Sequence, residues 1–437
     1  MTMEVELISR EIIKPSTPTP PHLRTHNLSF IEQNTPRTYL PVVYFYHKES
    51  SASPNGDHES NQLKKSLSEI LSKYYPFAGR IRDRASVDCN DEGVAFVEAR
   101  VRNVKLSEIL EHPEDTWLDL LFTDNLQWND DSSLSVIFAA QVSFFDCGGM
   151  AIGICMSHKV ADTSTVANFI NDWAARNKCD QYVPSPLFIG ADTFPQGDMP
   201  LFPETVLEKG DCVTKRFVFD ALKIASLKAI VADKVQNPTR VEVVTALIYS
   251  CAISALRSTS QSSLNPTVFI HTVNLRTRVV PPLPKNSVGS MIWAFTLSTA
   301  EDSVMELHDL VTQMKQSMTR FCDSYAQKFR GEDQWPAIFK ECTQALRKEF
   351  SIANLVTYRC SSWCRFPVYE ADFGWGKPIW VTIASCPLKN AIFLIDTRNG
   401  EGIEAYVNLE KQQLDVFERD AQLLAFASLN PSALDSI

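Results

Sequence analysis

The stretch SFFDCGGMAIGICMSHKVADTSTVANFINDWAA, Ser143 to Ala175, decides how the rest of the chain is interpreted. Its apolar run from Met150 to Met156 follows two glycines and is too short to span a membrane, which predicts a buried strand. Further on, apolar residues recur at helical spacing, and Thr163 or Ser164 is placed to cap the start of that helix. These apolar positions are Val166, Phe169, Ile170 and Trp173. The stretch therefore predicts a strand, a short connection and an amphipathic helix.

His158-Lys-Val-Ala-Asp162 forms the connection between this strand and this helix. A histidine at the end of a buried strand points into a cleft, and imidazole, with an ordinary pKa of about 6.5, can take a proton from a hydroxyl at neutral pH. The alternative interpretation is a solvated pair of residues four apart on a helix. No Gly-x-Ser-x-Gly elbow supplies a serine nucleophile. Cys147 or Cys155 could come close to His158 by folding, although a cysteine within a buried strand is more typical of a structural thiol.

Length and composition exclude several classes of protein. A chain of 437 residues with 44% hydrophobic and 22% charged residues is typical of a globular protein with two or three cores. The net charge of −10 disfavours binding to nucleic acid. The 11 cysteines are odd in number and follow no zinc-finger spacing, so we expect reduced thiols, a cytoplasmic location and no metal. No apolar run reaches spanning length, and we therefore expect no membrane association.

Strands and helices alternate throughout the sequence, which predicts an α/β fold of mixed sheets with flanking helices. A proline-rich segment without periodicity, 184–210, is expected to be a long crossover between an N-terminal domain, 1–183, and a C-terminal domain, 211–437. The expected strands are 5–13, 39–46, 94–101, 150–156, 215–219, 267–274, 379–385, 391–396 and 403–409. The expected helices are 62–75, 163–175, 221–235, 241–257, 306–322 and 412–427, and a polar loop is expected at 51–61.

A second motif, Asp372-Phe-Gly-Trp-Gly376, precedes Lys377-Pro378. Two glycines around a tryptophan predict a tight loop that presents a large ring with its N–H at a defined place. Such a loop could line a ligand channel with Asp372 as its anchor, or it could be a plain structural turn.

Taken together, these motifs resemble those of the plant BAHD acyltransferases, and the resemblance runs nearly end to end. His158 to Asp162 is similar to the family's His-x-x-x-Asp box, and Asp372 to Gly376 is similar to its second box. Further similar segments are Tyr75–Arg80, Val273–Arg278 and Asp396–Arg398, while Phe144–Gly149 resembles the alkaloid acetyltransferases of the family. The chain departs from the family pattern at Thr163, where glycine is usual, and at Ser290, where asparagine is frequent.

The resemblance implies two similarly folded halves, like chloramphenicol acetyltransferase, with a channel between them for CoA thioester and acceptor. His158 would be the general base, and Asp162 would pair with Arg276 to support the box. Asp372 and Trp375 are the other catalytic candidates, Trp375 as an oxyanion donor and Asp372 either as a catalytic group or as an anchor. Gly374, Gly376 and Lys377 are candidates for the CoA channel.

The resemblance also implies a monomer with acetyl-CoA as co-substrate, a small-molecule alcohol as acceptor and no permanently bound cofactor. Acyl transfer would be direct, within a ternary complex. A hydroxycinnamoyl or other aromatic donor is the alternative within this class of enzyme. Outside it, the alternative is a catalytically silent family member that acts as a binding protein.

Overall fold

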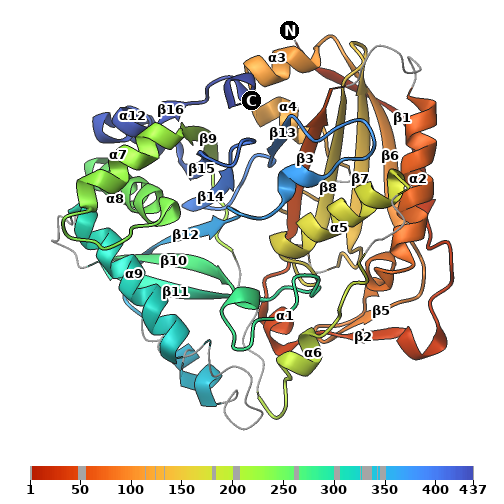
Figure 1. Cartoon of the computed structure of the whole chain (residues 1–437), viewed down its shortest axis with the longest axis horizontal. Helices are drawn as coiled ribbons and strands as arrows, with labels where there is room; N and C mark the ends of the chain where they lie inside the picture. The colour runs from red at the N-terminus through yellow and green to blue at the C-terminus, as the bar shows by residue number, and fades with distance from the viewer. Residues whose placement is uncertain are drawn as a thin grey trace.

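The computed structural model of the chain contains two large sheets side by side, each with its own helices (Figure 1). The structure describes residues 2–47, 56–113, 115–123, 125–131, 133–179, 184–199, 207–259, 265–299, 306–324, 326, 337–341, 343–344 and 351–436. The first sheet belongs to one hydrophobic cluster and most of the second sheet to another, and the mixed α/β fold class expected from the sequence is confirmed.

The first sheet has six strands in the order β1-β6-β7-β8-β3-β13, and β6 and β7 run parallel. Its strands are β1 (Glu4–Ile13), β6 (Val94–Arg102), β7 (Phe138–Phe145), β8 (Met150–Ser157), β3 (Tyr39–Tyr46) and β13 (Trp380–Thr382). All eight residues of β8 are buried, and Gly153 is needed there because a Cβ would lie 2.0 Å from the Leu121 carbonyl. Helices α2 (Asp57–Leu71) and α5 (Thr163–Asn177) pack together beside this sheet (Figure 1).

The second sheet has seven strands in the order β11-β10-β12-β14-β15-β9-β16. Its strands are β11 (Ile292–Thr299), β10 (Thr267–Asn274), β12 (Val356–Ser362), β14 (Ala391–Asp396), β15 (Ile403–Glu410), β9 (Cys212–Phe219) and β16 (Ser428–Leu429). The neighbours β10, β12 and β14 run parallel, so their carboxyl ends meet at one edge of the sheet. The helices around this sheet are α7 (Ala221–Val231), α8 (Arg240–Thr259), α9 (Leu307–Ser324), α11 (Lys411–Phe417) and α12 (Ala421–Phe426).

Helix α8 is central to the second core. In the described part of the chain it alone has the length and the mean hydropathy, 1.4, of a membrane span. Most of that segment is buried against other elements, as in the core helix of a soluble protein. Its apolar character therefore reflects packing within the second half.

Shorter elements connect these layers. The helices are α1 (Phe30–Asn34), α3 (Leu106–Glu111), α4 (Asp115–Asp119) and α6 (Gly190–Thr193), and the turns η1 (Pro21–Leu23), η2 (Tyr75–Ala78), η3 (Leu275–Thr277), η5 (Val368–Glu370) and η6 (Ala433–Ser436) are 3₁₀-helical. A small sheet contains β2 (Thr25–Asn27), β5 (Ser86–Asp88) and β4 (Arg80–Ile81).

Several expected boundaries were wrong. Helix α5 is capped by Asp162, whose side chain accepts from the Thr165 amide at 2.9 Å, and not by Thr163 or Ser164. The expected helix 412–427 is two helices, because the Asp420 carboxylate binds the amides of Gln422 and Leu423 and starts α12. Helix α2 already begins within the expected polar loop 51–61. Residues 51–55 of that loop, and residues 200–206 of the expected crossover 184–210, lie outside the described residues.

The two halves exchange pieces. Strand β13 lies in the sequence of the expected C-terminal domain, 211–437, but it pairs antiparallel with β3 of the first sheet. In the opposite direction, Phe30 and Ile31 of α1 belong to the second hydrophobic cluster. A buried ion pair lies at this junction, where Arg216 of β9 meets Glu404 of β15 at 2.6 Å and the indole of Trp380 donates to Glu404 at 3.2 Å.

One face of the second sheet is directed toward the first half. On β14 and β15 this face is covered, since Phe393 and Tyr406 belong to the first hydrophobic cluster and Phe393 packs on Trp128 with ring centroids 5.1 Å apart. On β10, β11 and β12 the residues in register on the same face are partly exposed. This open strip consists of Ile270, Thr272, Asn274, Ile292, Ala294, Thr296, Arg359 and Ser361. A buried sheet with a partly exposed strip indicates a surface available to a ligand.

Candidate active site

His158 follows directly after β8 and is partly exposed, whereas its neighbours Ser157 and Lys159 are buried. Its backbone N–H donates to the Thr38 carbonyl at 2.8 Å, which ties the end of β8 to the residue before β3. The Lys159 ammonium turns inward and donates to the Gln33 carbonyl at 2.9 Å. The imidazole is thus the one side chain of this turn that is available to a ligand.

The residues around the imidazole favour its neutral form. Burial lowers the pKa of His158, and this effect outweighs the charge of Asp162 and the backbone carbonyls of His158 and Ala161, which raise it. The ring Nδ1 lies 3.1 Å from the Oγ of Ser290, just before β11 of the other half. A neutral imidazole near pH 7 can accept a proton, as a general base must.

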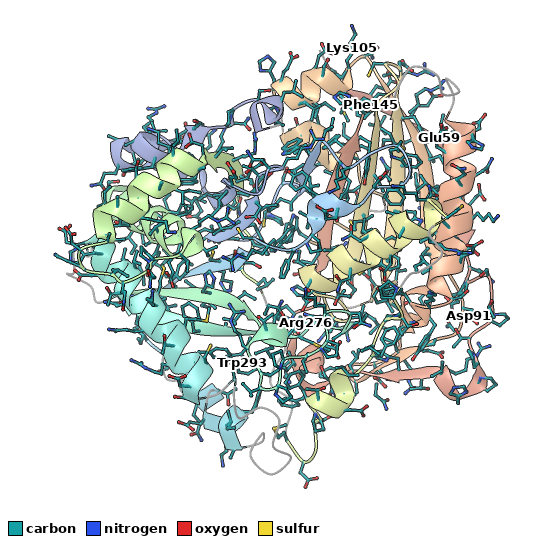
Figure 2. The ribbon with its side chains drawn as sticks, viewed as in Figure 1. Glu59, Asp91, Lys105, Phe145, Arg276 and Trp293 are labelled. Carbon is teal, nitrogen blue, oxygen red and sulfur yellow. The ribbon has the colours of Figure 1, made fainter. Side chains whose placement is uncertain are left out.

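Among the described residues, Asp162 forms its side-chain hydrogen bonds with groups other than the His158 ring, and it supports the turn that carries His158. Its Oδ1 caps α5, and its Oδ2 accepts from Nη1 of Arg276 at 2.6 Å and from the Met291 amide at 3.0 Å. Arg276 is 2% exposed and also donates to Thr165 and to the Gly289 carbonyl, both at 2.9 Å. The ion pair that the resemblance implies is therefore present, and it lies where the two halves meet (Figure 2).

A second buried carboxylate approaches the same segment. Glu32 of α1 forms a capping box with Ser29, and its Oε1 accepts from the Ser290 amide at 3.2 Å. Burial raises the pKa of Glu32 to about 7, against the hydrogen bonds from Ser29 and Ser290, which lower it. The pattern Ser29-x-x-Glu32 predicts such a cap, but nothing in the sequence relates it to His158.

The loop of the second box is held at the opposite end of α5. One carboxylate oxygen of Asp372 accepts from the amides of Gly374 and Gly376, both at 2.9 Å, and the other accepts from Lys178, the C-cap residue of α5, at 2.7 Å. Both glycines have a positive φ, +109° and +100°, which favours glycine although a Cβ would meet no atom within 4 Å. These hydrogen bonds outweigh the effect of partial burial and lower the pKa of Asp372.

The geometry separates Asp372 and Trp375 from His158. Fifteen residues of α5 lie between the two ends of the helix, a length of about 22 Å. Trp375 stacks on Phe373, with ring centroids 5.6 Å apart, and meets Tyr46 edge-on. This geometry supports a structural role for Asp372 and Trp375, which hold the loop at the far end of α5, and their catalytic roles stay a prediction.

The candidates for the CoA channel lie on the same loop. Gly374 and Gly376 are exposed and share the Asp372 carboxylate, and Lys377 pairs with Glu370 at 2.6 Å on the surface. None of the three contacts the turn of His158.

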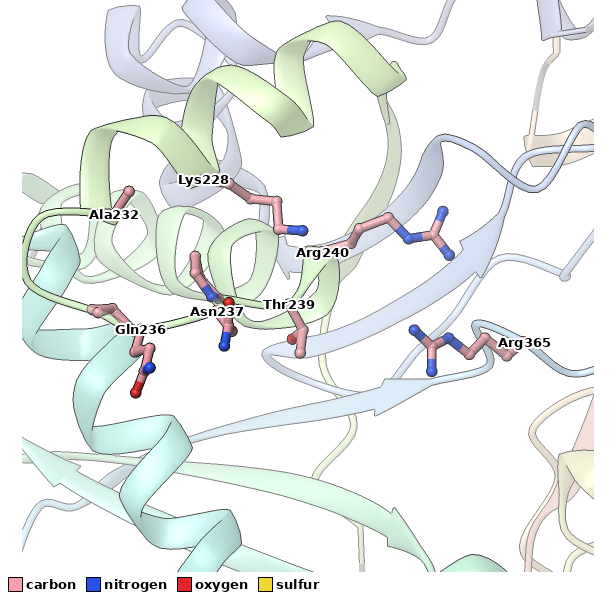
Figure 3. Close-up of a pocket in the computed structure, with 9 residues that line it drawn as sticks. Lys228, Ala232, Gln236, Asn237, Thr239, Arg240 and Arg365 are labelled. Atoms are coloured by element: carbon pink, nitrogen blue, oxygen red, sulfur yellow. The ribbon is translucent and has the colours of Figure 1, made fainter.

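A cationic hollow lies at the edge where β10, β12 and β14 end, and it was not anticipated from the sequence (Figure 3). Its volume is about 740 Å³, and it is lined by Lys228, Ala232, Val235, Gln236, Asn237, Pro238, Thr239, Arg240 and Arg365. Arg240 is held by Asp396 at the end of β14, at 3.0 Å. Arg365 follows β12, and its amide donates to the same carboxylate at 2.7 Å. Ligands of open α/β sheets bind at such carboxyl edges.

The cysteines near His158 in sequence are not placed as nucleophiles. Cys147 lies before β8 and His158 after it, so the eight residues of the strand separate them by about 26 Å. Cys155 is 1% exposed within the strand. Among the described residues, no group of three or more His, Cys, Asp or Glu side chains could hold a metal ion.

A family model described as the Transferase family matches residues 3–424. The chain belongs to this family, the BAHD acyltransferases. The BAHD chain is 42% identical to akuammiline synthase 1 of Alstonia scholaris, with 97% of this chain and 98% of the relative covered. It is 38% identical to a 17,18-epoxy-17-hydroxycur-19-ene N-malonyltransferase of Strychnos nux-vomica (98% and 91% covered) and 35% identical to a limonoid 1-O-acetyltransferase of Citrus sinensis (99% and 100% covered).

Solved structures agree with this assignment. The crystal structure of vinorine synthase matches with a TM-score of 0.85 and 32% identity, over 98% of this chain and 100% of that chain. A fungal protein, TRI101 of F. sporotrichioides, in complex with coenzyme A and T-2, matches with a TM-score of 0.70 at 13% identity, over 93% and 99%, and shows the shared fold. The BAHD chain is thus a CoA-dependent acyltransferase of plant specialised metabolism.

Proposed function

We propose that this BAHD enzyme transfers the acetyl group of acetyl-CoA to a hydroxyl of an alkaloid or terpenoid alcohol, with His158 as the general base. The observation that carries the proposal is a neutral, partly exposed imidazole at the end of β8, held 3.1 Å from Ser290 and next to the open strip. No other candidate base of the two boxes lies at this junction of the halves.

The proposed reaction is direct. Nε2 of His158 takes the proton of the acceptor hydroxyl, and the oxygen attacks the thioester carbonyl. The tetrahedral intermediate then collapses, the C–S bond breaks, and the proton on Nε2 passes to the departing CoA thiolate. General base catalysis of this kind contributes about 10²–10⁴-fold to the rate.

The open strip is the proposed wall for the acceptor. It begins next to Ser290 and Met291 with Ile292 and Asn274, and it continues across β10, β11 and β12. Its mixture of isoleucine, alanine, threonine and serine side chains suits a large, mostly apolar ligand with a few oxygen atoms. The limonoid and alkaloid relatives support this class of acceptor.

The cationic hollow is the proposed site for the phosphates of CoA. Lys228, Arg240 and Arg365 line it, no carboxylate is among its lining residues, and it lies at the same edge of the second sheet as His158. Arginine and lysine side chains bind phosphate through charge-assisted hydrogen bonds. The hollow therefore replaces Gly374, Gly376 and Lys377 as the proposed site.

The decisive experiment incubates purified protein with acetyl-CoA, malonyl-CoA or p-coumaroyl-CoA and a panel of alkaloid and terpenoid alcohols, with products read by mass spectrometry. We expect O-acetylated product, and we expect His158→Ala to lose at least about 100-fold in kcat while keeping its unfolding transition. Turnover only with the aromatic donor would reject the acetyl assignment. Absence of turnover with every donor would favour a silent binding protein.

A further inference from the structure

The segment Gly289 to Met291 is the part of the second half that touches His158. Ser290 is 0% exposed, and its Oγ lies 3.1 Å from Nδ1 of the imidazole. No other side chain is hydrogen-bonded to this ring in the part of the chain that the structure describes. The side chain at position 290 is thus a direct neighbour of the proposed base.

Two carboxylates hold the backbone of this segment in place. Oε1 of Glu32 accepts from the Ser290 amide at 3.2 Å, and Oδ2 of Asp162 accepts from the Met291 amide at 3.0 Å. Both residues are buried, so these hydrogen bonds are shielded from competition with water. These hydrogen bonds to the Ser290 amide and to the following amide hold the backbone that positions the Ser290 Oγ next to the ring.

Glycine at position 289 allows this arrangement, in which buried side chains clamp the backbone of residues 289–291. Its φ is +141°, and a Cβ on it would lie 2.7 Å from Oε1 of Glu32. The Oγ of Thr165 completes the clamp, since it donates to the Gly289 carbonyl at 2.9 Å and accepts from the Gly289 amide at 3.1 Å. Three side chains of the first half therefore converge on three consecutive residues of the second half.

The clamp bears on which ring nitrogen carries the proton. A neutral imidazole has one N–H donor and one acceptor nitrogen, and the hydrogen bond at one nitrogen decides the role of the other. At Nδ1 the side-chain neighbour is the Ser290 hydroxyl oxygen, which can accept, and the ring also interacts with the backbone carbonyls of His158 and Ala161, which can only accept. If Nδ1 donates, Nε2 keeps its lone pair and can act as the base.

We propose that Ser290 is the positioning residue of His158: its Oγ accepts the Nδ1–H of the imidazole, and this leaves Nε2 to take the proton of the acceptor hydroxyl. The inference rests on the proposed function of His158 as the base. It goes beyond that function because it assigns the tautomer of the ring to a residue at which this chain departs from the frequent asparagine. The same hydrogen bond persists when Nε2 becomes protonated, and so it also supports the imidazolium.

Ser290→Ala tests the inference, and Ser287→Ala is the matched control. Ser287 is equally buried in the same segment, but its Oγ donates to the Pro284 carbonyl at 2.7 Å and not to His158. The assay follows release of CoA thiol from acetyl-CoA, with the panel alcohol that reacts fastest or with water if none reacts. We expect Ser290→Ala to lower kcat about 10- to 100-fold with little change in the KM of acetyl-CoA, because a misplaced catalytic group costs up to about 100-fold. Ser290→Thr, which keeps the hydroxyl, should retain more of kcat, and Ser287→Ala should keep all of it.

A second measurement is made on the wild-type protein and does not depend on how Ser290→Ala folds. The ring ¹⁵N shifts of His158 in the wild-type protein, assigned by comparison with His158→Ala, should report a proton on Nδ1. A proton on Nε2 of the neutral ring, or equal kcat for Ser290→Ala and Ser287→Ala, overturns the inference even if His158→Ala is inactive. Full activity of His158→Ala would instead reject the proposed function itself.

Discussion

Breaking the ion pair between Asp162 and Arg276 should be costly and strongly non-additive. The two side chains are 4% and 3% exposed and their charged atoms are 2.6 Å apart, so each charge depends on the other. Removing one partner of a buried pair costs about 3–5 kcal/mol, because the remaining charge stays buried without compensation. Asp162→Asn keeps an oxygen that can cap α5, and its cost should come mainly from the lost charge. Arg276→Ala should cost at least as much.

The double variant should cost less than the sum of the two single variants by about 1–3 kcal/mol, which is the coupling expected of residues in contact. Urea unfolding of the four proteins gives this coupling directly. The matched control is the cycle of Lys377 and Glu370, which are 2.6 Å apart but 55% and 56% exposed. Their coupling should be at most about 1 kcal/mol, because solvent screens it. Strictly additive costs at Asp162 and Arg276 would show that the two charges do not stabilise each other.

The fold raises the pKa of Glu32 from 4.5 to about 7, so the folded state binds a proton more tightly than the unfolded state does. The free energy of unfolding should therefore fall by about 3 kcal/mol as the pH rises from the unfolded-state pKa of Glu32 to its folded-state pKa. The difference between wild type and Glu32→Gln in urea unfolding across pH 4–8 measures this loss, and parallel curves would contradict it. Trp375→Ala should lower the Tm and leave the kcat of folded enzyme unchanged, because the ring packs on Phe373; a loss in kcat without a loss in Tm would restore a catalytic role. Intact-protein mass spectrometry after a rapid quench with acetyl-CoA alone should show no acyl adduct, whereas a competent adduct on Cys147 or Cys155 would overturn direct transfer.

The sequence was sufficient for those elements whose pattern reflects local burial. Strands 39–46, 267–274 and 391–396 have the predicted bounds, because each is an interior strand of a sheet in which apolar, β-branched or aromatic residues recur. Strand β12 was not anticipated, since Arg359 and Ser361 lie on the open strip and give the strand a polar sequence. Its polarity is a property of the site, and only the assembled sheet reveals this.

The place of each motif residue was harder to anticipate than its presence. Asp372 and Lys178 are 194 positions apart in sequence, and only the folded chain shows that the second box is anchored at the far end of α5. Ser290 departs from the family pattern, but its contact with His158 arises only because the residues just before β11 of the second half pack against the turn of His158. Glu32 had a clear local signal as a helix cap, and its proximity to the site is purely tertiary.

The exchange of pieces between the halves determines how the chain can be divided. Without β13, the first sheet would expose the edge of β3, whose eight residues are all buried in the whole protein. Without Phe30 and Ile31, the second core would lose two of its buried side chains. A single cut in the connection would therefore leave two fragments that still contact each other through β13 and α1. Each half has its own sheet, but each also contributes residues to the other. The junction that bears His158 therefore forms only when both halves are present.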